Sequence, residues 1–204
     1  EIYLGLTILC SLAYWLGGMT LIDAISHSFS TVSIGGFSTH DASFAFFDNS
    51  ALNYICIAFM FISGINFALH FKAARAFSLR LYSQNSELKT YTSILLSHAF
   101  IVGAALFIIG SNLSDSMIFE QTLFQVVSFA TTSGFTSSNY ASWPSFIPVI
   151  LIFLSFYGGC GGSTAGGIKV IRILIMVKQL GKEITHLIHP HADMPIKLDH
   201  HVVS

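Results

Sequence analysis

Long stretches without charge dominate the pattern of hydrophobic and polar positions along this chain. Asp, Glu, Lys and Arg are absent from residues 2–22, 49–71, 90–114 and 121–168. Each of the first three stretches is about one bilayer crossing in length, because roughly 20 apolar residues span the hydrocarbon core. The fourth is too long for one crossing and contains prolines and a run of glycines, so it must be divided. The pattern predicts an all-α polytopic membrane protein.

The composition supports a membrane environment. Of the 204 residues, 53% are apolar and 9% are charged, and the mean hydropathy is +0.69. Soluble domains carry about 25% charged residues. A disordered chain, a nucleic-acid-binding protein with a basic surface and almost any soluble enzyme are therefore excluded. No Ser/His/Asp arrangement and no carboxylate pair indicates an enzyme, and we expect membrane lipid around the chain and no nucleic acid.

The basic residues are distributed asymmetrically. All nine Lys and Arg lie in residues 72–89 and 169–197, whereas 17–48 and 111–143 hold five acidic residues and no basic one. By the positive-inside rule, residues 72–89 and the C-terminal tail are cytoplasmic, and the two acidic segments face outside. The chain begins with Glu, and no basic region precedes its first apolar run. We therefore expect no signal peptide, and a piece of a longer protein.

A repeat with an offset of 98 residues organises the chain. Residues 30–38 (Ser-Thr-Val-Ser-Ile-Gly-Gly-Phe-Ser) correspond to residues 128–136 (Ser-Phe-Ala-Thr-Thr-Ser-Gly-Phe-Thr). Each motif follows an apolar span and a short amphipathic helix, and a second span comes after it. These segments are 2–16, 21–32 and 51–71 in the first unit and 92–110, 117–130 and 145–157 in the second.

The repeat predicts four regions along the chain. They are a first pore-loop repeat over 1–71, a cytoplasmic connector over 72–89, a second pore-loop repeat over 90–180 and a cytoplasmic tail over 181–204.

The short amphipathic helices are too short to cross a membrane. Thr20 and Asp23 predict a capping box at the start of the first, and Ser114 with Asp115 offers the same at the second. Each helix ends in hydroxyl residues and glycine. This is typical of a re-entrant pore loop, whose backbone is tolerated at that depth only where it is buried in protein or lines a watery cavity.

Each Gly-Phe motif contains a run of small or β-branched residues that ends in glycine. An extended run can point successive carbonyls at one axis, and glycine permits the positive φ that turns a carbonyl inward. Carbonyl rings replace the hydration shell of a monovalent cation, and neither loop has the carboxylates that Ca²⁺ prefers, which indicates K⁺. One such loop would be typical of an ordinary turn, but two copies favour a filter. The predicted potassium-binding backbone residues are Ser33, Ile34, Gly35, Gly36, Thr131, Thr132, Ser133 and Gly134.

Six glycines interrupt the last apolar stretch. Gly costs a helix roughly 0.8–1 kcal/mol relative to Ala, so residues 145–177 are predicted to form two half-helices joined by a loop. A simple helix kink is the alternative, and a phosphate-binding loop is disfavoured because the GK[ST] ending is missing. Lys169 and Arg172 follow, and either anchor the broken helix or extend to the interface. The glycines are Gly158, Gly159, Gly161, Gly162, Gly166 and Gly167.

Three segments, residues 31–41, 129–136 and 158–172, resemble the Trk/Ktr/HKT superfamily of potassium transporters, and the resemblance extends over essentially the whole chain. It implies four span–pore-loop–span repeats around one pore, of which this chain holds the second and third. It implies a K⁺ selectivity filter with one loop from each repeat, and a gate formed by the loop at 158–167 under that filter.

The resemblance also implies a multi-pass protein of the bacterial inner membrane that forms a homodimer and binds a cytosolic nucleotide-binding regulatory subunit. K⁺ is the expected cargo, bound as a metal only at the filter residues, with no organic cofactor. Two other interpretations stay open. One is the potassium-binding, channel-like subunit of a K⁺-pumping ATPase, and the other is a non-conducting membrane scaffold.

Overall fold

A computed structural model describes residues 1–109, 114–188, 196–199 and 201–203 of the chain. Residues 110–113, at the end of a predicted span, and residues 189–195, 200 and 204 of the predicted tail lie outside the described residues. The helices are α1 (Ile2–Leu16), α2 (Leu21–Val32), α3 (Ser50–Ser63), α4 (Phe67–Ala76), α5 (Arg80–Gln84), α6 (Ser86–Ile109), α7 (Asp115–Thr131), α8 (Phe146–Tyr157) and α9 (Val170–Ile188). Two 3₁₀ turns are η1 (Ser43–Phe46) and η2 (Tyr140–Ser142), and a short antiparallel hairpin pairs β1 (Ile196–Leu198) with β2 (His201–Val203).

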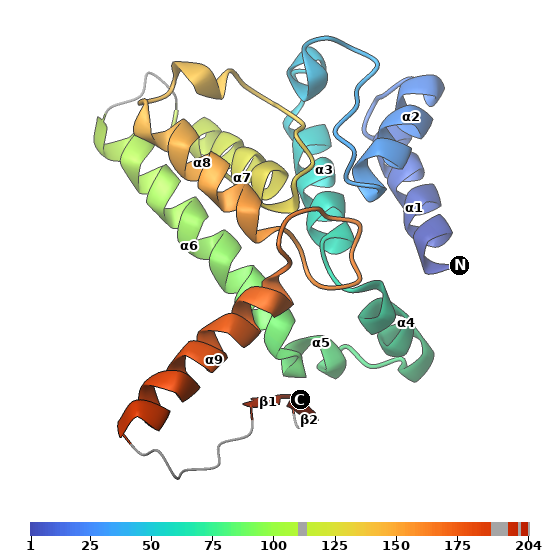
Figure 1. Cartoon of the computed structure of the whole chain (residues 1–204). Helices are drawn as coiled ribbons and strands as arrows, with labels where there is room; N and C mark the ends of the chain where they lie inside the picture. The colour runs from blue at the N-terminus through green and yellow to red at the C-terminus, as the bar shows by residue number, and fades with distance from the viewer. Residues whose placement is uncertain (110–113, 189–195, 200, 204) are drawn as a thin grey trace.

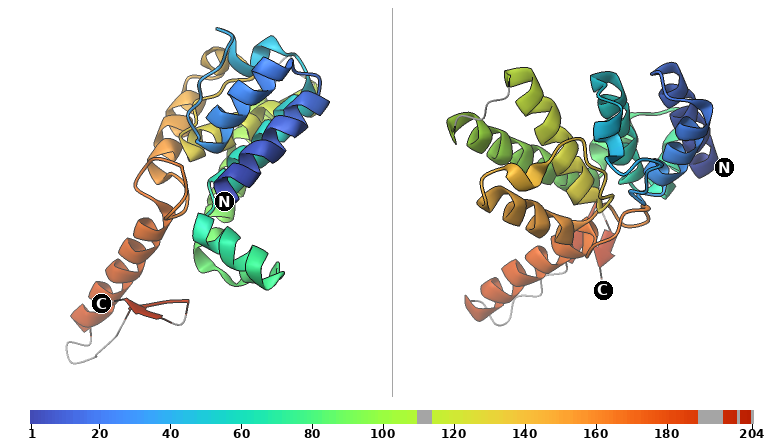
Figure 2. Two further views of the ribbon diagram at one scale, coloured as in Figure 1. Left: turned by 90° about the vertical axis from the view of Figure 1, so that its right-hand side faces the viewer. Right: turned by 90° about the horizontal axis from the view of Figure 1, so that it is seen from above.

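The helices form two similar units side by side. In the first, α2 packs against α1 and α3; in the second, α7 packs against α6 and α8. The units meet where α3 packs along α7, and α9 projects away from both, as Figures 1 and 2 show. This is the predicted order of span, short helix, loop and span. The all-α fold is confirmed, with the small hairpin as an addition that the sequence did not predict.

An aromatic cluster fills the junction between the units. Phe44 is fully buried, and its ring lies 5.8 Å from that of Tyr14, 5.5 Å from that of Phe124 and 4.9 Å from that of Phe135. Large buried aromatic side chains contribute strongly to packing. The cluster joins α1, η1 and α7, and so fixes the two predicted pore loops relative to each other.

Among the described residues, α6 is the one single helix long and apolar enough to cross a bilayer. The helices α3 and α4 pass the same test only as a pair, and they meet at an angle of 93°. The span expected over 51–71 is therefore not one continuous helix but a helix pair with a break between Ser63 and Phe67. The chain turns at Gly64, where a side chain would collide with the Tyr91 hydroxyl, and Asn66 then caps α4 by accepting the N–H of Ala68 at 2.8 Å. The helices α1 and α8 are shorter apolar helices.

The two predicted capping boxes have different outcomes. Thr20 caps α2 as expected, since its hydroxyl accepts the N–H of Asp23 at 3.2 Å. Ser114 is the N-cap residue of α7, but its side chain forms no capping hydrogen bond and contacts the Ser116 hydroxyl at 3.2 Å instead. The second capping prediction is wrong because the serine side chain turns to a nearby hydroxyl.

Candidate ion-conducting site

The two predicted filter loops leave their helices through the same hydrogen bonds. In the first, the N–H of Gly35 donates to the carbonyl of Ser30 at 2.7 Å; in the second, the N–H of Ser133 donates to the carbonyl of Ser128 at 2.9 Å. These pairs are related by the offset of 98 residues. Since α2 ends at Val32 and α7 ends just before Thr132, each helix points its partly negative C-terminal end at its own loop.

The backbone conformation also repeats. The φ angles of Ile34 and Gly36 are 56° and 70°, and those of Thr132 and Gly134 are 63° and 86°. Left-handed residues thus alternate with ordinary ones in both loops. Glycine was expected to supply this conformation, but Ile34 and Thr132 are β-branched, and positive φ at such residues costs of order 1–3 kcal/mol. Strain of this kind persists only where surrounding contacts fix the backbone.

The two loops touch each other at Gly36. A Cβ atom there would collide with the carbonyl oxygen of Ser133, whereas a Cβ atom on Gly134 would meet nothing within 4 Å. The following phenylalanines differ in the same sense, since Phe135 is fully buried against the first unit and Phe37 is 82% exposed. Each unit therefore has one face that fits its neighbour, and the pair leaves one such face open at each end.

Residues outside the two predicted filter loops also join the units. The carbonyl of Thr136 accepts the N–H of Ala45 at 3.2 Å, and the N–H of Thr136 donates to the Ser43 hydroxyl at 3.3 Å. The η1 turn of the first unit is thus hydrogen-bonded to the segment that leaves the second loop.

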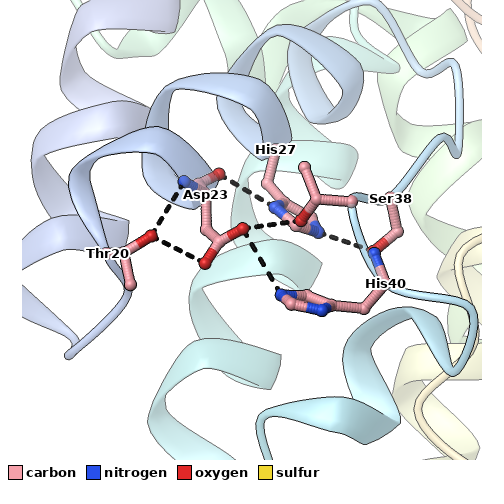
Figure 3. Close-up of polar contacts among 6 residues, drawn as sticks. Thr20, Asp23, His27, Ser38 and His40 are labelled. Atoms are coloured by element: carbon pink, nitrogen blue, oxygen red, sulfur yellow. Dashed lines mark hydrogen bonds and ion pairs between the residues drawn. The ribbon is translucent and has the colours of Figure 1, made fainter.

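A polar cluster, made of Thr20, Asp23, Thr39 and His40, surrounds the start of α2, as Figure 3 shows. The carboxylate of Asp23 accepts hydrogen bonds from the Thr39 hydroxyl at 2.6 Å and the Thr20 hydroxyl at 2.7 Å, and it lies 3.4 Å from Nε2 of His40. The hydroxyls of Thr39 and Thr20 lower the pKa of Asp23 below its usual value. The start of α2 is thereby tied to the chain beyond the filter.

The glycine-rich loop (residues 158–167) connects α8 to α9 and closes at a narrow neck. Gly158 and Gly167 lie against each other, so that a Cβ atom on Gly167 would be 2.7 Å from Cα of Gly158. Two backbone bonds hold the neck: the N–H of Ile168 donates to Phe156, and the N–H of Val170 donates to Gly159, both at 3.0 Å. The segment is a closed loop between two helices and not the simple kink that was its alternative.

The glycine-rich loop rests on the bend between α3 and α4. The N–H of Cys160 donates to the carbonyl of Gly64 at 2.8 Å, and the N–H of Phe67 donates to the carbonyl of Gly162 at 3.1 Å. The bend therefore supplies backbone groups that an unbroken helix would have kept for itself.

Two charged side chains hold the same loop. The carboxylate of Glu87, which is buried at the start of α6, accepts the N–H of Gly161 at 2.5 Å. The ammonium group of Lys169 donates to the carbonyls of Ala165 and Ser163, the latter at 3.4 Å. Of the two roles considered for Lys169, it therefore takes that of an anchor.

The glycine-rich loop also reaches both predicted filter loops. The Thr164 hydroxyl donates to the carbonyl of Val32 at 2.9 Å, and the N–H of Gly166 donates to the Thr132 hydroxyl at 2.8 Å. Val32 directly precedes the first filter loop, and Thr132 belongs to the second. The sequence analysis predicted the filter loops and the glycine-rich loop as separate segments. In the structure, these two hydrogen bonds link them.

Residues 1–113 and 111–203 match the family model TrkH, described as a cation transport protein. The chain belongs to the TrkH family. This confirms the resemblance carried by residues 31–41, 129–136 and 158–172.

Several TrkH relatives are close in sequence. The chain is 48% identical to the "Trk system potassium uptake protein TrkH" of Vibrio parahaemolyticus and 46% identical to that of Escherichia coli. Both alignments cover 97% of this chain and 41% of the relative. The crystal structure of the potassium transporter TrkH from V. parahaemolyticus superposes with a TM-score of 0.92 at 48% identity, over 97% of this chain and 42% of that one. The chain thus spans about two fifths of the length of the relatives that it matches, and these are named as transporters.

In this member of the TrkH family, no group of three or more His, Cys, Asp or Glu side chains that could hold a metal ion occurs among the residues that the structure describes. The sequence did not identify Glu87, Gly64 or Thr164 as part of the site. The one visible signal was the acidic Glu87 itself, which stands close to an apolar span in a chain with few charges.

Proposed function

We propose that this chain forms two adjacent quarters of the selectivity filter, and the gate, of a potassium uptake protein in the bacterial inner membrane. The observation that carries the proposal is the pair of loops with equal capping bonds and the same alternation of φ, in contact at Gly36 and Ser133. Backbone carbonyls can replace the hydration shell of K⁺ in such loops. The names of the relatives support K⁺ as the cargo.

The open faces support a ring of four units. Gly36 fits the unit that follows it and Phe135 fits the unit that precedes it, so Gly134 and Phe37 present the same two faces without a partner among the described residues. A following unit would cover Gly134, and a preceding unit would cover Phe37. Together with the two units described, this gives a closed filter with one loop from each unit.

We assign the gate to the glycine-rich loop. It bonds to Val32 and Thr132 at the inner ends of both filter loops, and it is held by reversible contacts with Glu87 and Lys169. Release of those contacts would let the loop leave the pore while α8 and α9 stay in place. Lipid surrounds the spans, and residues 72–89 and the C-terminal tail are cytoplasmic. A homodimer and a nucleotide-binding subunit complete the proposal, and membership of relatives in a named "Trk system" is consistent with a second component.

The proposal is tested with the full-length protein in a bacterial strain that lacks its own potassium uptake. The parent should restore growth at low K⁺, and Gly36→Ser should lower the K⁺/Na⁺ uptake ratio, because its side chain would collide with the Ser133 carbonyl. Gly181→Ser is the matched control, since a Cβ atom there meets nothing within 4 Å. Unchanged uptake in Gly36→Ser at equal expression would favour a scaffold. Uptake that requires an ATP-hydrolysing partner would favour the subunit of a K⁺ pump.

A further inference from the structure

Each of the two pore helices carries a fully buried polar side chain at the same position of the repeat. These are His27 in α2 and Gln125 in α7, and they are 98 residues apart. A polar side chain is costly to bury unless it finds hydrogen-bond partners. Each side chain has one hydrogen-bond partner on the segment that leaves the filter loop of its own unit, residues 37–40 or 135–138.

His27 joins α2 to the segment that follows the first filter loop. Its Nδ1 lies 2.8 Å from the carbonyl of Asp23, which can only accept, so Nδ1 carries the proton. Nε2 of the neutral ring then accepts the hydroxyl of Ser38 at 2.8 Å, and that hydroxyl oxygen accepts the N–H of His40 at 3.1 Å (Figure 3). The ring is thus connected to the backbone of His40, four residues beyond Gly36.

Gln125 reaches the equivalent backbone by a different bond. Its Nε2 donates to the carbonyl of Ser138 at 3.3 Å, and Ser138 corresponds to His40 at the offset of 98. One unit uses an imidazole and a serine hydroxyl, and the other uses a single amide. The same connection is therefore made twice with different chemistry, which points to the connection itself as the shared feature.

The surroundings of His27 make the connection rigid. Its ring lies 5.4 Å from that of Phe44, 5.3 Å from that of Phe47 and 6.2 Å from that of Phe135. Phe135 directly follows Gly134. His27 is therefore hydrogen-bonded to the segment that follows its own filter loop, and it also packs against the end of the neighbouring loop.

We propose that His27 and Gln125 are positioning residues that fix the segments directly after the filter loops and thereby set the preference for K⁺ over Na⁺. The inference rests on the proposed filter function of residues 33–36 and 131–134. Both loops contain a strained, left-handed β-branched residue, and a loop released from its brace can relax toward ordinary conformations. Relaxation would change the spacing of the carbonyls that replace the hydration shell.

The test compares His27→Leu with His27→Gln in the full-length protein, by K⁺ and Na⁺ uptake into proteoliposomes. Leu removes both hydrogen bonds, and the K⁺/Na⁺ ratio should fall about 2- to 10-fold, the factor expected for one net hydrogen bond. Gln can accept the Ser38 hydroxyl as the histidine does, so it should keep the ratio within about 2-fold of the parent. Gln125→Leu should lower the ratio as His27→Leu does, and Gln179→Leu on α9 is the exposed control.

A correctly assembled His27→Leu protein with the parent ratio would overturn the inference, as would His27→Gln with a loss equal to that of His27→Leu. If His27→Leu fails to assemble, Ser38→Ala removes the same hydrogen bond by deleting the Ser38 hydroxyl. The same drop in the K⁺/Na⁺ ratio is then expected. Gly36→Ser in the same assay separates the two proposals. A drop in Gly36→Ser without a drop in the His27 and Ser38 variants rejects the brace alone, whereas no drop in any of them rejects the filter.

Discussion

Replacement of Glu87 by methionine is expected to open the proposed gate. The carboxylate of Glu87 accepts the N–H of Gly161 at 2.5 Å from a buried position at the start of α6. Methionine has a similar length and no acceptor of comparable strength. The substitution therefore removes one anchor of the glycine-rich loop and leaves the contacts of that loop with Gly64, Lys169 and Thr132 in place.

The magnitude follows from the type of bond. A hydrogen bond to a charged group contributes about 1.5–3 kcal/mol. Since each 1.4 kcal/mol is a factor of ten, the ratio of closed to open gate should fall roughly 10- to 150-fold. Glu87→Gln keeps an acceptor without the charge. It should produce a smaller change, because a neutral hydrogen bond contributes about 0.5–1.5 kcal/mol.

The assay is K⁺ flux and single-channel open probability of the full-length protein in lipid bilayers. Flux should rise in the order parent, Glu87→Gln, Glu87→Met, with assembly checked by size-exclusion chromatography. Glu183→Met is the control, because Glu183 is exposed on α9, where its carboxylate accepts the side-chain amide of Gln179 at 2.5 Å. A monodisperse Glu87→Met protein with the open probability of the parent would refute the role of this carboxylate in the gate.

Three further predictions concern the membrane topology, the neck of the glycine-rich loop and the polar cluster around Asp23. Cysteines at Asp41 and Asn139 should react with an impermeant thiol reagent from outside, and one at Ser83 only from the cytoplasm. Gly158→Ala should lower the thermal midpoint and raise K⁺ flux, because φ is 70° there and a Cβ atom would collide with the opposite side of the neck. The lowered pKa of Asp23 contributes stability that is present above pH 3.8 and lost as the pH falls through the native pKa, so Asp23→Asn should flatten the acid dependence of the thermal midpoint.

Each of these predictions has a contradicting outcome. Labelling of Ser83 from outside would overturn the assignment of the spans. A Gly158→Ala protein as stable and as active as Gly181→Ala would show that the neck does not constrain the loop. Equal loss of stability in acid for the parent and Asp23→Asn would show that the Asp23 carboxylate does not stabilise the polar cluster at the start of α2.

The order of elements could be predicted because it depends on local chemistry. Charge-free stretches have the length that a bilayer requires, Thr20 caps α2, and the Gly-Phe motifs lie where α2 and α7 end. The offset of 98 residues then related one loop to the other. Local rules failed at the second cap, where Ser114 has a competing hydroxyl partner, and at the span that turns at Gly64.

The contacts that assemble the site could not be predicted from the sequence. Glu87 and Gly161 are 74 residues apart, and Thr164 and Val32 are 132 residues apart. No pattern of periodicity or capping pairs residues at such separations. The left-handed conformation of Ile34 opposes the preference of a β-branched side chain, so it can be explained only by the packing around it.

The potassium filter is tested most directly by a crystal structure of the full-length protein grown in Rb⁺, which replaces K⁺ and scatters anomalously. We predict anomalous peaks on the pore axis, in contact with backbone carbonyls of residues 33–36 and 131–134. Peaks confined to other parts of the protein, or bound only by side-chain oxygens, would contradict the assignment of these loops as the potassium filter.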